Sequence, residues 1–299
     1  MIALENLRGI MLMVISMAAF AVEDMLIKLA SDSMSVGQIL AILGAVDGAI
    51  FYALLRANGE RLLGRDLLHA PVILRNMGEV FGSLAFVTAI VLIPISTASS
   101  ILQASPLVVT MGAALFLGEA VGWRRWTATF IGFLGVLMVV RPGLEGFDAN
   151  ALFAVAGVIG LAIRDVATRA IPRSLTSLRL GALAMLLLVP TGLIMASFSG
   201  GFQTPSPISL VYISIAAIIG VGGYYAVTSA TRLGEISVIA PFRYSRLVFA
   251  MLVGIFVFSE RPDLWTMLGA AIIILSGIYT FVRERRIRQK LAAAAALQF

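Results

Sequence analysis

Hydrophobic residues along this chain fall into ten runs that are separated by short polar or charged links. Most runs come close to the ~20 apolar residues that a helix needs to cross the hydrocarbon core of a bilayer. The pattern therefore predicts an all-α integral membrane protein with ten transmembrane helices. The predicted spans are residues 9–30, 36–56, 72–93, 95–117, 124–141, 149–169, 177–198, 208–231, 235–258 and 264–282.

The second half of the chain repeats the pattern of the first half. A shift of 141 residues pairs Ser96 with Ser237, Gln103 with Tyr244, Glu119 with Glu260, Ser83 with Tyr224, Asp24 with Asp165 and Lys28 with Arg169. One nearly constant offset over a whole half-chain indicates an internal duplication. We predict a first five-helix repeat over residues 1–142, a second over 149–290 and a frayed cytoplasmic tail over 291–299. Because five is an odd number, the two repeats must be inverted in the membrane, as in many secondary transporters.

Lysine and arginine residues are divided unevenly between alternate links. One set of links holds three of them, Lys28, Arg141 and Arg261. The other set, with the two chain ends, holds 16, which are Arg8, Arg56, Arg61, Arg65, Arg75, Arg124, Arg125, Arg169, Arg173, Arg179, Arg232, Arg283, Arg285, Arg286, Arg288 and Lys290. The side richer in these residues is cytoplasmic. We therefore predict that both termini lie in the cytoplasm.

Composition excludes several classes of function. The chain has 299 residues, 60% of them hydrophobic, and its mean hydropathy is +1.00. Its net charge of +6 does not indicate nucleic-acid binding, because the basic residues lie between apolar runs. The absence of cysteine excludes disulfides, thiolate catalysis and zinc–thiolate sites. We expect no cofactor and no metal ion, and we assign no role to the single histidine, His69.

Polar residues share one helix face in four of the predicted spans. Such faces predict either a central cavity or hydroxyl groups that bond neighbouring helices together. The two halves match in these faces, which favours a cavity lined by Glu79, Ser83, Phe86, Ser99, Gln103, Tyr224, Thr228, Pro241 and Tyr244. Pro241 is expected to bend the ninth span, because proline cannot continue the backbone hydrogen bonding of a helix. We expect Tyr244 to present its ring and hydroxyl to the cavity.

Several ionisable residues lie inside the predicted spans, where they are functional candidates by default. They are Glu23, Asp47, Glu79, Arg164, Arg243 and Arg246. Glu79 is the candidate for coupling transport to protons; the alternative is an ion pair with Arg75, one helical turn earlier, and uncoupled facilitated diffusion is a third reading. Spacing also predicts two local ion pairs, Asp24 with Lys28 and Asp165 with Arg169.

The ends of the two repeats and one internal motif resemble a known family. The repeats end in Gly118-Glu119 and Ser259-Glu260, and the second contains Ala240-Pro241-Phe242-Arg243-Tyr244. The chain resembles the ten-helix, EamA-type branch of the drug/metabolite transporter (DMT) superfamily, and within it bacterial aromatic amino-acid exporters of the YddG type. Ser259 departs from the usual glycine. The resemblance implies a bacterial inner-membrane protein whose cavity is lined by the third, fourth, eighth and ninth helices.

The function expected from these observations is secondary transport. We expect the chain to export small amphipathic metabolites, most of all amino acids, by alternating access around the cavity. Uptake or a channel activity are alternatives. An intramembrane enzyme is a further class, but the chain lacks the His-Glu-x-x-His and Gly-x-Ser-x-Gly motifs. The expected partners are a small-molecule substrate and membrane lipid, without nucleic acid, and the expected state is a monomer.

Overall fold

The computed structural model describes residues 2–118, 122–144, 146–172, 174–198, 201–233 and 236–296, and every regular element in these ranges is a helix. The elements are α1 (Ile2–Ala30), α2 (Val36–Ala57), η1 (Arg65–Leu68), α3 (Ala70–Leu92), α4 (Ile95–Leu102), α5 (Ser105–Phe116), α6 (Trp123–Val140), α7 (Ala151–Arg169), α8 (Ser177–Phe198), α9 (Pro207–Leu233), α10 (Ile236–Ile239), η2 (Ala240–Tyr244), α11 (Ser245–Phe258) and α12 (Leu264–Ala296). In the described residues, eight spans are long and apolar enough to cross a membrane, and α6 and α12 contain two shorter apolar helices. The predicted all-α membrane fold with ten spans is confirmed.

Two of the spans are interrupted at corresponding places. In the fourth span, α4 ends at Leu102 and α5 begins at Ser105. In the ninth span, a 3₁₀ turn that contains Pro241 separates α10 from α11. The offset of 141 residues places these breaks on one another. Both spans contain a proline near the break, which removes a donor from the helical ladder.

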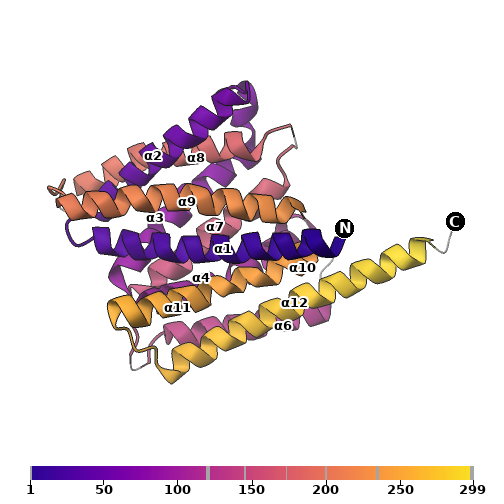
Figure 1. Cartoon of the computed structure of the whole chain (residues 1–299). Coiled ribbons are helices and arrows are strands. Elements are labelled where there is room, and N and C mark those ends of the chain that lie inside the picture. The colour runs from indigo at the N-terminus through magenta and orange to yellow at the C-terminus, as the bar shows by residue number, and fades with distance from the viewer. Residues whose placement is uncertain are drawn as a thin grey trace.

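Helices pair between the two repeats rather than within them. α1 packs along α9, α3 along α7, α2 along α8, and α6 along α12 (Figure 1). Under the repeat offset α1 corresponds to α7 and α9 to α3, so the α1–α9 and α3–α7 interfaces are the same arrangement made twice. Small residues allow this close packing: a side chain at Gly160 would collide with the backbone of Gly82. The repeats are therefore interleaved around a common core.

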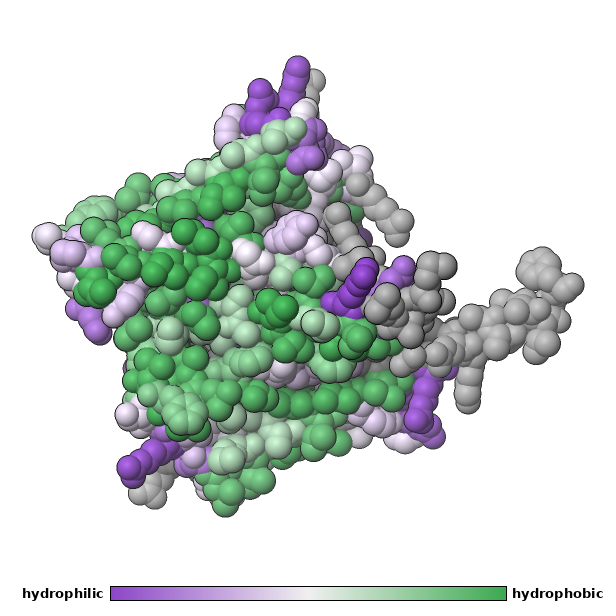
Figure 2. Space-filling model, in the orientation of Figure 1, coloured by the Kyte–Doolittle hydropathy of each residue, from purple (hydrophilic) through white to green (hydrophobic). Residues whose placement is uncertain are grey.

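The ends of the helices define two polar faces of the molecule. α1 begins and α12 ends at the same face (Figure 1), which we call the terminal face; the links after α1, α3, α6, α8 and α11 lie at the opposite face. Hydrophobic side chains cover most of the view between the faces (Figure 2). The expected frayed tail is helical through Ala296, because alanine is the strongest helix former.

The links contain residues with a left-handed backbone and are held by ion pairs. Gly118 and its equivalent Ser259 have φ of 67° and 53°, which explains why glycine is usual at this position. At the terminal face, Arg179 donates to both carboxylate oxygens of Asp66 at 2.5 and 2.9 Å. These hydrogen bonds from Arg179 lower the pKa of Asp66. At the opposite face, Arg141 pairs with Asp263.

Candidate functional site

The two repeats enclose a central cavity of about 720 Å³, a volume typical of small-molecule sites. The third, fourth, eighth and ninth spans contribute to its lining, and α1, α2, α7, α8 and α12 contribute as well. Met13, Thr168 and Ser177 extend the lining toward the terminal face. On the terminal face the lining reaches the last residue of α7, Arg169, and the first residue of α8, Ser177. Toward the opposite face it stops at Ile27, Leu40 and Ile90, beneath the contacts that close that face, so the cavity leads to the terminal face.

Contacts between the repeats close the opposite face. Glu260 accepts hydrogen bonds from the backbone N–H groups of Ile95 (2.6 Å) and Ser96 (3.0 Å), at the N-terminus of α4. The hydroxyl of Ser96 donates to the same carboxylate at 2.6 Å. Lys28 donates to the carbonyl oxygens of Ile90 and Ile93, at the end of α3. The Glu260 contacts cap α4 across the repeat boundary. Lys28 caps α3 within the first repeat and meets the second repeat at the ring of Phe258, 5.5 Å from its Nζ atom.

Five of the nine residues predicted for the cavity lie in its lining: Glu79, Ser83, Phe86, Gln103 and Tyr224. Four lie outside it: Ser99, Thr228, Pro241 and Tyr244. These four residues do not reach the cavity because part of each predicted helix face points toward a neighbouring helix.

The residues outside the lining have other surroundings. Ser99 is buried in α4, and the hydroxyl of Thr228 donates to the carbonyl oxygen of Tyr224 at 2.8 Å. Tyr244 is buried with its hydroxyl against Gly277 of α12, where any larger side chain would collide with it. Glu119 and the side chain of Ser237 lie outside the described part of the chain.

Ten of the residues that line the cavity are charged. Among the described residues it contains five arginines and five carboxylates, which are Arg75, Arg164, Arg169, Arg243, Arg246, Glu23, Asp24, Asp47, Glu79 and Asp165. Charged groups inside a membrane are costly unless they are paired or serve a ligand. Which of them are paired therefore decides what the cavity can bind.

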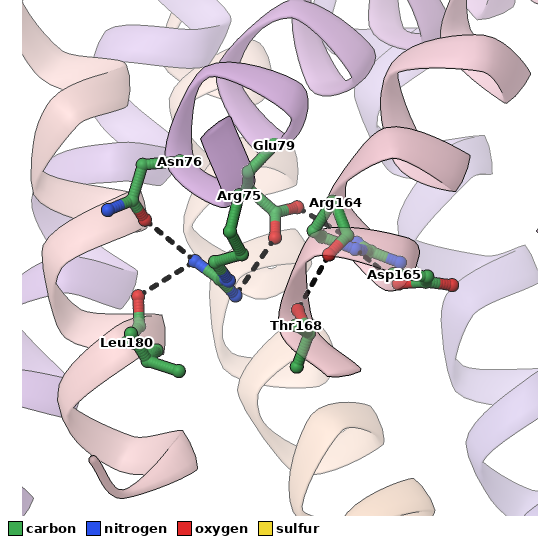
Figure 3. A network of polar contacts seen from close by, with 7 residues as sticks. All are labelled: Arg75, Asn76, Glu79, Arg164, Asp165, Thr168 and Leu180. Carbon is green, nitrogen blue, oxygen red and sulfur yellow. Dashed lines mark hydrogen bonds and ion pairs between the residues drawn. The ribbon is translucent and has the colours of Figure 1, made fainter. Parts of the chain in front are cut away.

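One network joins α3 to α7 and α8 (Figure 3). Glu79 accepts from Arg75 Nη2 at 3.2 Å and from Arg164 Nη1 at 3.0 Å. Arg164 Nε also donates to Asp165 at 2.7 Å, and Arg75 Nη1 donates to the carbonyl oxygen of Leu180 at 2.9 Å. Each carboxylate oxygen of Glu79 thus accepts a hydrogen bond from one arginine. The alternative ion pair with Arg75 is present, and Arg164 adds a second cation.

A second group of charges lies where α1 meets α11. Arg246 Nη2 donates to Asp24 Oδ2 at 2.7 Å, and its guanidinium lies over the rings of Phe20 (5.2 Å) and Phe86 (5.6 Å). The expected local pairs were wrong, because Asp24 pairs with Arg246 and Asp165 with Arg164. Spacing along one helix could not reveal Arg246, which comes from the other repeat, and Asp165 bonds to the adjacent Arg164 of its own helix.

Three charged groups of the lining have no ion-pair partner in the described part of the chain. They are Glu23, Asp47 and Arg243, and the last has an exposed side chain. Asp47 is only 8% exposed, and its Oδ1 atom lacks any hydrogen-bond partner among the described residues. The sequence marked all three as ionisable groups inside spans, but only the structure separates them from the paired ones. Together they give the cavity both an uncompensated cation and uncompensated carboxylates.

Comparison with known proteins matches the chain to transporters. A family model described as the EamA-like transporter family matches residues 7–141 and 149–282. An S-adenosylmethionine uptake transporter of Rickettsia felis is 28% identical over 216 residues, covering 72% of both chains. A riboflavin transporter of Rhizobium johnstonii is 28% identical over 69% of this chain and 68% of its own.

Two further matches extend over nearly the whole chain. The pseudopaline exporter CntI of Pseudomonas aeruginosa is 27% identical over 90% of this chain and 94% of its own length. A solved crystal structure superposes with a TM-score of 0.63 at 17% identity, covering 96% of this chain and 99% of that one. The structural match concerns the fold alone.

Proposed function

This chain belongs to the EamA-like transporter family, and on that premise we propose that it exports small amphipathic amino acids by alternating access. The names of its relatives give three different cargos, so family membership does not select the substrate. The cavity supports the choice. An amino acid carries one carboxylate and one ammonium group, and the lining carries charges of both signs that have no ion-pair partner among the described residues.

The observation that carries this proposal is the position of Arg243. It follows Pro241 in the interrupted ninth span, its side chain is exposed, and it lines the cavity. Arginine binds a carboxylate through two parallel hydrogen bonds. The rings of Phe20, Phe86 and Tyr224 lie in the same lining and provide apolar area for an amphipathic side chain. Arg243 is thus the proposed carboxylate site.

The distribution of closed and open ends supports an outward route. The terminal face is the basic one, which is cytoplasmic by the charge rule, so the cavity is proposed to load from the cytoplasm. Release would require the contacts of Glu260 with α4 and of Lys28 with α3 to separate. The Glu260 contacts join the two repeats, and Lys28 also meets the second repeat at the ring of Phe258; the repeats are the parts expected to rock against each other.

The orientation is testable in this cysteine-free chain. Asn58 lies in a terminal-face link and Gln203 in an opposite-face link. We expect an impermeant thiol reagent added outside intact cells to label Gln203→Cys and not Asn58→Cys. The reverse labelling would place the cavity mouth on the outside and contradict loading from the cytoplasm.

The transport proposal is tested in proteoliposomes with labelled phenylalanine. We expect saturable uptake that is accelerated by unlabelled phenylalanine on the other side of the membrane, since exchange of this kind distinguishes a carrier from a channel. Arg243→Gln should reduce the rate at low substrate by about tenfold or more, the loss expected for a charge-assisted hydrogen bond. Arg261→Gln removes an exposed arginine outside the cavity and should leave transport unchanged. No exchange of any amino acid by the wild type would reject the proposal.

A further inference from the structure

The two equivalent helix interfaces differ at one pair of positions. The 141-residue offset that relates the repeats carries Glu79 onto Gly220 and Glu23 onto Arg164. The packing follows the same correspondence: Gly82 lies against Leu161 where α3 meets α7, and Gly223 lies against Phe20 where α9 meets α1. Phe20 corresponds to Leu161 under the same offset. The pair Glu79–Arg164 and the pair Gly220–Glu23 therefore occupy equivalent places.

One of these places holds a complete ion pair and the other holds half of one. Arg164 and Glu79 meet at 3.0 Å. At the equivalent place the arginine is replaced by Glu23 and the glutamate by Gly220, so a carboxylate stands where a cation stands in the other interface. A Cβ atom added at Gly220 would lie 2.6 Å from Glu23 Oε1. The glycine thus provides the space that the Glu23 carboxylate fills.

No residue in the described part of the chain replaces the missing cation. The charged neighbours of Glu23 are Asp24, Asp47 and Arg246, and Arg246 is already bonded to Asp24 at 2.7 Å. Asp47 comes from α2, lines the same cavity and is more than nine-tenths buried, with one oxygen unpartnered among the described residues. Two carboxylates in a low-dielectric site without a cation are unfavourable. The arrangement calls for a positive group from outside the chain.

We propose that Glu23 and Asp47 bind the cationic group of the transported substrate, an organic ammonium, and that they form a subsite separate from Arg243. The inference rests on the proposed carrier function, because the ligand reaches the carboxylates through the transport cavity. The rings of Phe51 and Tyr224, which meet edge to face at 5.0 Å, line the cavity beside Asp47. Aromatic and carboxylate groups together are suited to an ammonium with an apolar substituent. The subsite predicts a preference for zwitterionic or cationic substrates over purely anionic ones.

The test uses three probes that differ only in their charged ends. Phenylalanine carries both charges, phenethylamine only the ammonium, and 3-phenylpropionate only the carboxylate. Binding of each to the purified full-length protein is measured by titration calorimetry. We expect Glu23→Gln and Asp47→Asn to weaken phenylalanine and phenethylamine by about tenfold or more and to leave 3-phenylpropionate unchanged. Arg243→Gln should weaken the binding of phenylalanine and 3-phenylpropionate and leave phenethylamine unchanged. Asp32→Asn removes an exposed carboxylate outside the cavity and should change nothing.

The outcomes separate this inference from the proposed function. If phenethylamine binds and depends on Glu23 while phenylalanine does not bind, the cation subsite stands and the amino-acid substrate is rejected. If phenethylamine does not bind the wild type at millimolar concentration, or binds Glu23→Gln and Asp47→Asn as tightly as the wild type, the subsite is rejected. It is also rejected if Glu23→Gln alters only the pH dependence of transport, because the carboxylate then takes a proton. Gly220→Ala, which displaces the Glu23 carboxylate without removing charge, repeats the test if Glu23→Gln fails to fold.

Discussion

The α3–α7 interface and the α1–α9 interface share one packing arrangement and differ in how their charges are satisfied. In the first, Glu79 pairs with Arg75 and Arg164, and Asp165 also pairs with Arg164, so two carboxylates neutralise two arginines. In the second, Glu23 lies against Gly220 with no cation bonded to it among the described residues. Duplication supplied the same scaffold twice, and the side chains then diverged. The neutralised side is expected to stabilise the fold, and the uncompensated side is the one that we propose binds a ligand.

The largest effect on stability should come from breaking the ion-pair network of the α3–α7 interface. Glu79→Gln leaves the buried Arg75 without its carboxylate and removes one of the two carboxylates that Arg164 contacts, and the loss of one partner of a buried ion pair costs roughly 3–5 kcal/mol. Glu23→Gln removes a carboxylate that has no cation partner, so the free energy of unfolding should be unchanged or higher. Thermal unfolding of the two purified variants in the same detergent makes the comparison. Equal destabilisation by both variants would contradict the division into a structural and a ligand-binding side.

A smaller effect should follow from filling the space beside Glu23. Gly220→Ala and Gly222→Ala both place alanine in α9 and gain the same helix propensity, but only the first meets the Glu23 carboxylate. Because that carboxylate can swing away, the two variants should have similar stability. We expect phenethylamine affinity to fall about tenfold, or about 1.4 kcal/mol, in Gly220→Ala alone. Equal affinities in the two alanine variants would show that the position of Glu23 does not matter for binding.

The smallest expected effect concerns the equivalent turns at the repeat ends. Both Gly118 and Ser259 have a left-handed backbone, which costs roughly 1 kcal/mol for a residue with a side chain. We expect Gly118→Ser to lower the free energy of unfolding by about 1 kcal/mol and Ser259→Gly to raise it by a smaller amount, since glycine also loses more backbone entropy. Denaturation of both variants measures the difference. Destabilisation by Ser259→Gly would mean that the serine side chain makes a stabilising contact.

Much of the scaffold could be predicted from the sequence, because the length of each apolar run and the 141-residue offset depend only on local pattern. The interrupted ninth span is of this kind, since Pro241 disrupts a helix wherever it occurs. The partners of the charged residues could not be predicted in the same way. Asp24 bonds to Arg246, 222 positions away, and a local rule that pairs residues four apart selects Lys28 instead.

The direction in which each polar helix face points could not be predicted from the sequence either. Tyr244 lies on the polar face predicted for the ninth span, yet it packs against Gly277 because α12 approaches that side of the helix. Glu260 caps α4 of the other repeat, a contact that no local pattern indicates. Glu23 and Asp47 were visible as ionisable residues inside spans. Their relation to Gly220 depends on which helices of the two repeats meet, and that is a property of the fold.

The most direct test of the central claim copies one interface into the other. The double variant Glu23→Arg with Gly220→Glu places at the α1–α9 interface the same pair that Arg164 and Glu79 form between α7 and α3. Phenethylamine titration and thermal unfolding are measured on one preparation, with each single variant beside it. We predict that the double variant is more stable than either single variant and gives no phenethylamine binding. Binding at the wild-type affinity, or a double variant less stable than both single variants, would contradict the equivalence of the two interfaces and the role of Glu23.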